Sequence, residues 1–182
     1  MVYLADLPGT IEWPSPIRET LQDLFNQVIK ASSDFTSVKV EYSSKPPALG
    51  VHDLLVYFVA SRSGSVLQKG MSASLNLGDT GTTGIGGTLV GSEVYLSGNQ
   101  SKPIGLGKLA FHELMHNICL LKDGLHSLPD LSLGKEEITP DTKLSEGDIK
   151  LLAKNLTKSR VQWTDGYKYK TQKGDPFGDP LA

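Results

Sequence analysis

The pentapeptide His-Glu-Leu-Met-His, from His112 to His116, constrains the fold of this 182-residue chain more than any other segment. It lies within residues 105 to 122, whose apolar spacing predicts a long helix that ends at Asp123-Gly124. Residues i and i+4 of a helix lie on one face, so both imidazoles can reach the same metal ion. Two imidazoles hold an ion incompletely, and the chain must therefore return a third ligand to this helix.

Four residues are candidates for that third ligand. His126 lies just past Gly124, and a chain that reverses at this glycine can bring the imidazole back under the metal; we favour it because imidazole suits zinc. Asp123 is an alternative oxygen ligand, and Glu146 from a later helix would give two histidines and a glutamate. Cys119 lies a helical turn too far along for the same ion, and we interpret it as a small buried core residue.

Glu113 directly follows the first histidine of the pentapeptide. Zinc prefers nitrogen ligands and, in catalytic sites, keeps one position for water. A glutamate beside the metal can take a proton from zinc-bound water and later pass it to a leaving amine. Five residues therefore predict two ligands and a general base around one Zn²⁺ ion.

Two further helices are predicted, one on each side of this segment. Residues 15 to 33 read SPIRETLQDLFNQVIKASS and place a set of apolar residues on one helical face: Ile17, Leu21, Leu24, Phe25 and Val28. Residues 144 to 160 read LSEGDIKLLAKNLTKSR, where Ser145 is a suitable N-cap and Asp148 follows at the capping-box position. Both segments are therefore expected to bury one side.

The strands are predicted between the first two helices. Residues 37 to 43 alternate apolar and polar, and residues 52 to 60 form a continuous apolar run that is typical of a central strand. One or two short strands are expected within residues 86 to 97, and another around residues 73 to 77. We expect a single α+β domain over residues 1–182, with a small mixed sheet, an N-terminal helix, the helix of the pentapeptide and a C-terminal helix.

The two ends of the chain carry weaker patterns. Residues 1–14 are interpreted as an irregular or extended lead-in, and residues 161–182 as a polar C-terminal tail. The N-terminus lacks the basic start and apolar core of a signal peptide, and no apolar run is long enough to span a bilayer. We therefore expect a soluble protein, although the sequence does not indicate its compartment.

Composition excludes several classes of partner. The net charge is −2 and the pI is near 6.1, so nothing favours nucleic acid or an anionic membrane surface. Cys119 is the single cysteine, which excludes an internal disulfide. We expect a monomer whose partner is a protein or peptide substrate.

The sequence resembles the metzincin zinc metallopeptidases, nearest to the matrixins, whose motif is H-E-x-x-H-x-x-G-x-x-H followed by a Met-turn. The resemblance extends to four further segments: DLLVYFVA (third strand), GIGGTLVGSEVYLS (edge strand and the strand that follows), GLGKLAFHELMHN (active-site helix) and LSEGDIKLL (C-terminal helix). It covers about residues 15 to 160, and only the histidine motif is specific.

Two departures from the matrixin pattern concern the metal site. Cys119 stands where the family has glycine, and His126 comes four residues late, so the helix is expected to run about one more turn before it breaks at Gly124. No methionine follows His126, and Leu131 or Leu133 is expected to fill the hydrophobic floor of the Met-turn.

The resemblance implies a zinc-dependent endopeptidase, with His112, His116 and His126 as ligands and Glu113 as the base. It also implies that the substrate adds as a strand beside an edge segment: Ile85, Gly86, Gly87, Thr88, Leu89 and Val90. Two alternatives stay open. One is a zinc-stabilised, non-catalytic binding domain of zincin fold, and the other is a zincin-type hydrolase that cleaves a bond outside proteins.

Overall fold

The computed structural model describes residues 1–6, 14–32, 37–42, 53–59, 78–79, 84–86, 92–95, 103–119, 121 and 123–156. Its helices and strands follow one another in the order β1 (Val2–Asp6), α1 (Pro14–Lys30), β2 (Val40–Tyr42), β3 (Leu54–Val59), β4 (Gly78–Asp79), β5 (Gly84–Gly86), β6 (Ser92–Tyr95), α3 (Pro103–Cys119), the 3₁₀ helix η2 (Asp123–Leu125) and α4 (Glu146–Asn155). Within these residues, no helix has the length and apolar content that a membrane span requires.

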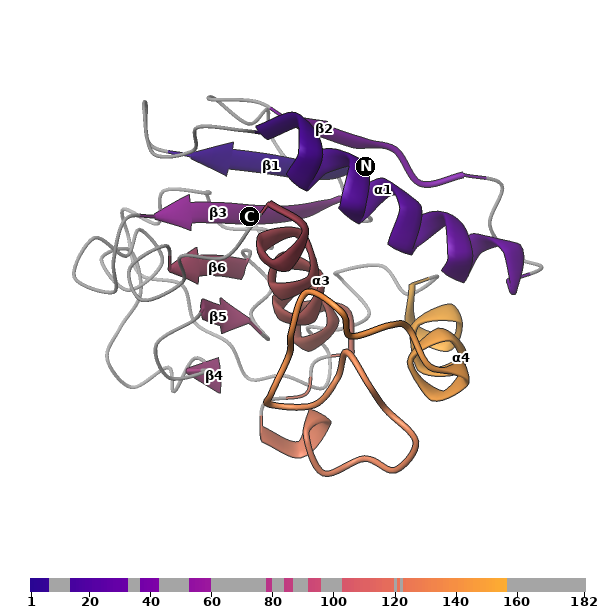
Figure 1. Ribbon diagram of the computed structural model, residues 1–182. Helices are drawn as coiled ribbons and strands as arrows, with labels where there is room; N and C mark the ends of the chain where they lie inside the picture. Colours follow the sequence, from indigo (N-terminus) through magenta and orange to yellow (C-terminus); the bar gives the residue numbers. More distant parts are fainter. Residues whose placement is uncertain are drawn as a thin grey trace, which may run out of the picture.

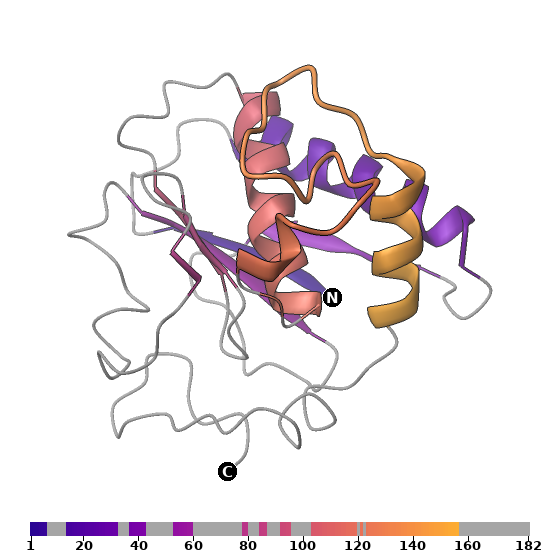
Figure 2. The ribbon, with the colours of Figure 1, turned by 90° about the horizontal axis from the view of Figure 1, so that it is seen from below.

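The strands form one mixed sheet in the order β2-β1-β3-β6-β5-β4. The first four strands of this order are parallel, β5 runs antiparallel to β6, and β4 runs antiparallel to β5. Figure 1 shows the sheet with α1 and α3 in front of it, and the view in Figure 2 shows that α1, α3 and α4 lie on the same side of the strands. This layout agrees with the predicted α+β class.

The N-terminal segment differs from the prediction. Val2–Asp6 is extended, which is one of the two predicted states, but it is an inner strand and not a lead-in, because Val2 pairs with Val40 on one side and with Leu54 on the other. Val2 is 1% exposed, so the strand contributes to the core. Pro8 does not disfavour this strand, because the strand ends before it, at Asp6.

The segment predicted to bind substrate at the sheet edge is also placed differently. Ile85 and Gly86 lie in β5, but Asp79 and Gly78 of β4 pair with them on the outer side. The outermost described strand is therefore β4, and the edge position predicted for Ile85 and Gly86 was wrong. Sequence could not reveal this pairing because a two-residue strand carries no periodic pattern. Residues 87–90 lie outside the described residues.

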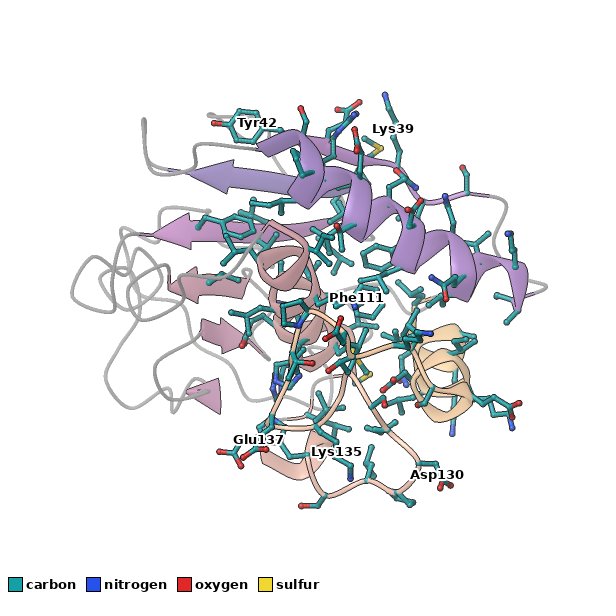
Figure 3. The ribbon with its side chains drawn as sticks, viewed as in Figure 1. Lys39, Tyr42, Phe111, Asp130, Lys135 and Glu137 are labelled. Carbon is teal, nitrogen blue, oxygen red and sulfur yellow. The ribbon has the colours of Figure 1, made fainter. Side chains whose placement is uncertain are left out.

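Helix α1 buries the predicted apolar face. All five of its predicted apolar residues are at most 5% exposed: Ile17, Leu21, Leu24, Phe25 and Val28. The rings of Phe25 and Phe111 lie with their centroids 5.0 Å apart, and Figure 3 shows Phe111 between α3 and α1. A tilted aromatic pair at this distance stabilises the contact beyond the area it buries.

The crossing of α1 and α3 depends on a glycine. A Cβ added at Gly107 would lie 2.7 Å from the Cβ of Thr20 and 3.3 Å from the carbonyl oxygen of Ile17. Only a residue without a side chain permits this approach of the two helices. The close packing places α3 deep in the molecule, and its residues 109 to 118 are buried on every side.

Helix α4 begins as predicted. The Ser145 side chain accepts a hydrogen bond from the Asp148 backbone, and the Asp148 carboxylate accepts one from the Ser145 backbone, which completes a capping box. The helix ends at Asn155, short of the predicted residue 160. The predicted polar tail, residues 161–182, lies outside the described residues.

Candidate metal centre

The pentapeptide lies on α3, as predicted, and its chemical groups point into the protein. His112 is 1% exposed, and Glu113 and His116 are fully buried. Burying three polar side chains costs free energy unless each finds a partner or a ligand. The three polar side chains on the buried face of α3 therefore need hydrogen-bond partners or a ligand inside the protein.

Helix α3 ends earlier than predicted. It stops at Cys119, where the matrixin motif has glycine, and the expected extra helical turn is absent. The Leu121 backbone N–H bonds the His116 carbonyl at 3.2 Å, a six-residue closure that is typical of a helix C-terminus. The four extra residues are instead taken up in the connection that contains η2.

Gly124 is not the hinge that the sequence suggested. It lies in η2, its φ lies outside the left-handed range, and a Cβ added there would meet nothing within 4 Å. Helix α3 ends at Cys119, five residues before Gly124, so its termination does not use the freedom of that glycine.

His126 returns to α3 after this reversal. Its Nε2 atom lies 3.1 Å from Nε2 of His116 and 3.3 Å from Nε2 of His112, and the first two histidines are 3.1 Å apart at the same atoms. Within the described residues, these three side chains form the group that can hold a metal ion. The ligand set favoured from the sequence is confirmed as a spatial cluster.

The two helical histidines are oriented by backbone carbonyl groups. Nδ1 of His112 donates to the Leu133 oxygen at 2.7 Å, and Nδ1 of His116 donates to the Leu121 oxygen at 2.6 Å. A carbonyl oxygen only accepts, so the proton of each neutral ring is on Nδ1. Each Nε2 atom therefore presents a lone pair to the centre of the cluster, as a metal ligand requires.

The contact between Nε2 of His112 and Nε2 of His116 brings two lone pairs to 3.1 Å and is not a hydrogen bond. Protonating the rings would not relieve it cheaply. The pKa of His112 is lowered to about 3, by burial first and by the neighbouring His116 second, and the Leu133 carbonyl only partly offsets these effects. A cation bound between the three Nε2 atoms would satisfy the converging lone pairs, and the residues present fit one.

The loop that carries His126 is fixed at two further places. Lys135 donates from Nζ to the carbonyl oxygens of His126 and Leu128, at 3.2 and 2.8 Å. Asp148 of α4 accepts hydrogen bonds from the backbone of residues 132 to 134. Figure 3 shows Lys135 on this loop, below α3, with Asp130 at its outer turn.

The other candidate ligands are separated from the cluster or outside the description. Glu146 is 90% exposed and pairs with Lys150 at 3.4 Å, so it is not a ligand. Cys119 is half-buried and does not belong to the ligand group. The side chain of Asp123 lies outside the described residues. Leu133 is fully buried and contacts His112 through its carbonyl, and Leu131 is also buried; a role of either side chain as the floor of the site stays a prediction.

Sequence reasoning missed the groups that orient the ligands. Asp148 was assigned only to the capping box, and that role already accounts for a carboxyl at this position, so no signal of a second role remained. The Leu133 and Leu121 carbonyls are invisible to any motif because every residue has one. Lys135 could have been noticed as a cation nine residues after His126, within the loop that carries this histidine.

No protein-family model matches the chain, and no curated protein or solved structure is significantly similar to it. The functional conclusion therefore depends on the geometry of this cluster and on the residues around it.

Proposed function

We propose that the protein is a zinc-dependent endopeptidase with a zincin-like, matrixin-related catalytic domain. The observation that carries the proposal is the convergence of three Nε2 atoms on the helix that also bears the buried Glu113. A ligand pair four residues apart, with a carboxyl group next to the first ligand, is the arrangement that metal-assisted peptide hydrolysis needs.

The distances support zinc as the ion. Zinc binds imidazole nitrogen at about 2.0–2.1 Å, and tetrahedral angles would then separate two such nitrogens by about 3.3–3.4 Å. The observed separations are 3.1, 3.1 and 3.3 Å. A set made of imidazoles alone disfavours Mg²⁺ and Ca²⁺, which take oxygen ligands. Three protein ligands leave a fourth position for water or substrate, as in catalytic sites.

The residues of the chain then have separate tasks. A zinc ion held there supplies Lewis acidity to the substrate carbonyl and to the attacking water. Glu113 accepts a proton from that water while the water oxygen bonds the carbonyl carbon of the substrate. Glu113 then returns the proton to the amine nitrogen as the C–N bond breaks. The carbonyls of Leu133 and Leu121 hold the two helical imidazoles in the tautomer that this requires.

The substrate is proposed to bind as an extended peptide beside the antiparallel end of the sheet. The strand β5 lies against α3, which carries the cluster. Because β4 covers the outer side of Ile85 and Gly86, the peptide would pair with β4 or with a segment beyond it, through main-chain hydrogen bonds.

The test is a substitution of Glu113 to glutamine, which keeps the shape of the side chain and removes the base. Cleavage of a peptide library by the zinc-loaded protein, read by mass spectrometry, is expected to fall about 10²–10⁴-fold while bound zinc is unchanged. Glu137→Gln is the matched control, because Glu137 is an exposed carboxyl on the ligand loop. Full activity in Glu113→Gln would overturn the proposal.

One observation favours the second candidate, a zinc-stabilised domain without catalysis. His112, Glu113 and His116 are each at most 1% exposed, which leaves little of these side chains open to a substrate. This alternative predicts tight zinc binding, unfolding when the zinc is removed, and no cleavage of any library peptide by the wild-type protein.

A further inference from the structure

The carboxylate of Asp148 forms more hydrogen bonds than a capping box uses. Its Oδ2 atom accepts from the Ser145 and Leu133 N–H groups, both at 2.9 Å, and its Oδ1 atom accepts from the Gly134 N–H at 3.1 Å. The Ser132 N–H lies between the two oxygens, at 3.1 and 3.2 Å. The side chain is fully buried. Only the bond from Ser145 belongs to the cap, so most of the acceptor capacity of this carboxylate is directed at the ligand loop.

One of these bonds leads directly to a metal ligand. The Gly134 N–H and the Leu133 carbonyl belong to a single peptide group, which is planar and trans, so they point in opposite directions. The N–H faces Asp148, and the carbonyl oxygen faces Nδ1 of His112 at 2.7 Å. When the N–H direction is fixed, the direction of the carbonyl is fixed as well.

We propose that Asp148 is a positioning residue for the metal centre, acting on His112 through the Leu133–Gly134 peptide. This inference depends on the metal centre of the proposed function. The negative carboxylate polarises the peptide group, and the carbonyl becomes a stronger acceptor for the His112 Nδ1 proton. The imidazole is thereby held in place and made more basic at Nε2, which raises its affinity for the metal.

The experiment compares Asp148→Asn with Ser145→Ala. In Asp148→Asn, either orientation of the amide turns its NH₂ group toward backbone N–H donors of the loop or of Ser145, so the link is weakened in an isosteric side chain. Ser145→Ala removes the N-cap and its bond to the Asp130 carbonyl but leaves the bonds from the loop to Asp148 intact. Both variants destabilise the start of α4, and only the first reaches His112.

Zinc affinity is measured by competition with a chromophoric chelator, and the visible absorption of the Co²⁺-substituted proteins reports the ligand geometry. Asp148→Asn is expected to weaken zinc binding about 10–100-fold and to change the Co²⁺ spectrum, while Ser145→Ala keeps wild-type affinity and spectrum. Unchanged zinc affinity in Asp148→Asn would overturn the proposal, and so would an equal loss in Ser145→Ala.

If Asp148→Asn does not fold without metal, Asp148→Glu replaces it. Glutamate keeps the charge and the capping-box position but displaces the carboxylate by one methylene from the loop. Weakened zinc binding with an intact fold supports the role of Asp148, and wild-type affinity overturns it. Peptide cleavage is not a readout here. Failure of the wild-type protein to cleave peptides therefore bears on the proposed function alone, and failure to bind zinc overturns the metal centre itself.

Discussion

Nε2 of His126 lies 3.1 Å from Nε2 of His116, although the chain leaves α3 at Cys119 and passes through η2 before it returns. The cluster is therefore closed by a loop residue. The other two histidines are oriented through Nδ1 by backbone carbonyls, whereas the loop that carries His126 is held by the bond from Lys135 to the His126 carbonyl.

The first prediction concerns this third ligand. His126→Ala is expected to reduce bound zinc to well below one ion per chain, because two imidazoles four residues apart leave the ion incompletely held. Asp123→Ala is expected to retain one ion. Metal analysis of dialysed protein checks both. Zinc that is lost in Asp123→Ala and kept in His126→Ala would reassign the ligand, and zinc that is kept in both would remove His126 from the set.

The members of the histidine cluster were predictable from sequence because the i, i+4 rule places two of them together and a nearby histidine supplies the third. The route of the chain between them was not. The sequence suggested a longer helix that breaks at Gly124, whereas α3 ends at Cys119. Helix termini depend on which backbone carbonyls find partners, here His116 with Leu121, and this pairing has no signature in residue type.

The second prediction concerns removal of the metal. The ion would cross-link the loop around His126 to α3, so a chelator is expected to lower the melting temperature. Ligand present at 100 times its Kd stabilises a fold by about 2.7 kcal/mol. Hydrogen exchange should rise in residues 123 to 131 and change little in α1, whose apolar face is buried without help from the site. Equal protection of the loop with and without zinc would contradict a metal centre.

The third prediction separates two glycines. Gly124→Ala is expected to change the free energy of unfolding by no more than about 0.5 kcal/mol, because an added Cβ meets open space there. Gly147→Ala is expected to cost about 1–3 kcal/mol, because its Cβ would collide with the backbone carbonyl of Asp130. Urea denaturation of the two variants measures the difference. A larger loss in Gly124→Ala would restore this glycine as the hinge.

In the sheet, as at the end of α3, the features that depend on backbone pairing could not be predicted from residue types. The central strand was predictable because an unbroken apolar run is typical of a strand that is buried on both faces. Leu54, Val56 and Phe58 are indeed buried. Residues 2 to 6 were predicted as irregular or extended but not as a paired strand, because Val2–Asp6 is short and ends two residues before a proline. Its role comes from pairing on both edges with segments 38 and 52 residues further along, as in Val2 with Val40 and Leu54. Such pairing is a tertiary property.

The last prediction is the pH dependence of the metal-free protein. Burial, followed by the neighbouring His116, lowers the pKa of His112 to about 3, against about 6.5 for an exposed imidazole. Between these values the unfolded chain binds the proton and the folded chain does not, so stability rises with pH across this window and is fully present above it. From pH 7 to pH 5 the contribution of His112 falls by about 2 kcal/mol.

Urea denaturation of the chelator-treated protein at pH 7 and pH 5 measures this loss. His112→Asn is the matched variant, since its amide can still donate to the Leu133 carbonyl but does not titrate. The wild-type protein is expected to lose about 2 kcal/mol more than His112→Asn between the two pH values. If both proteins lose the same amount, His112 is not held neutral by the fold, and the lone pair assigned to its Nε2 atom would have to be withdrawn.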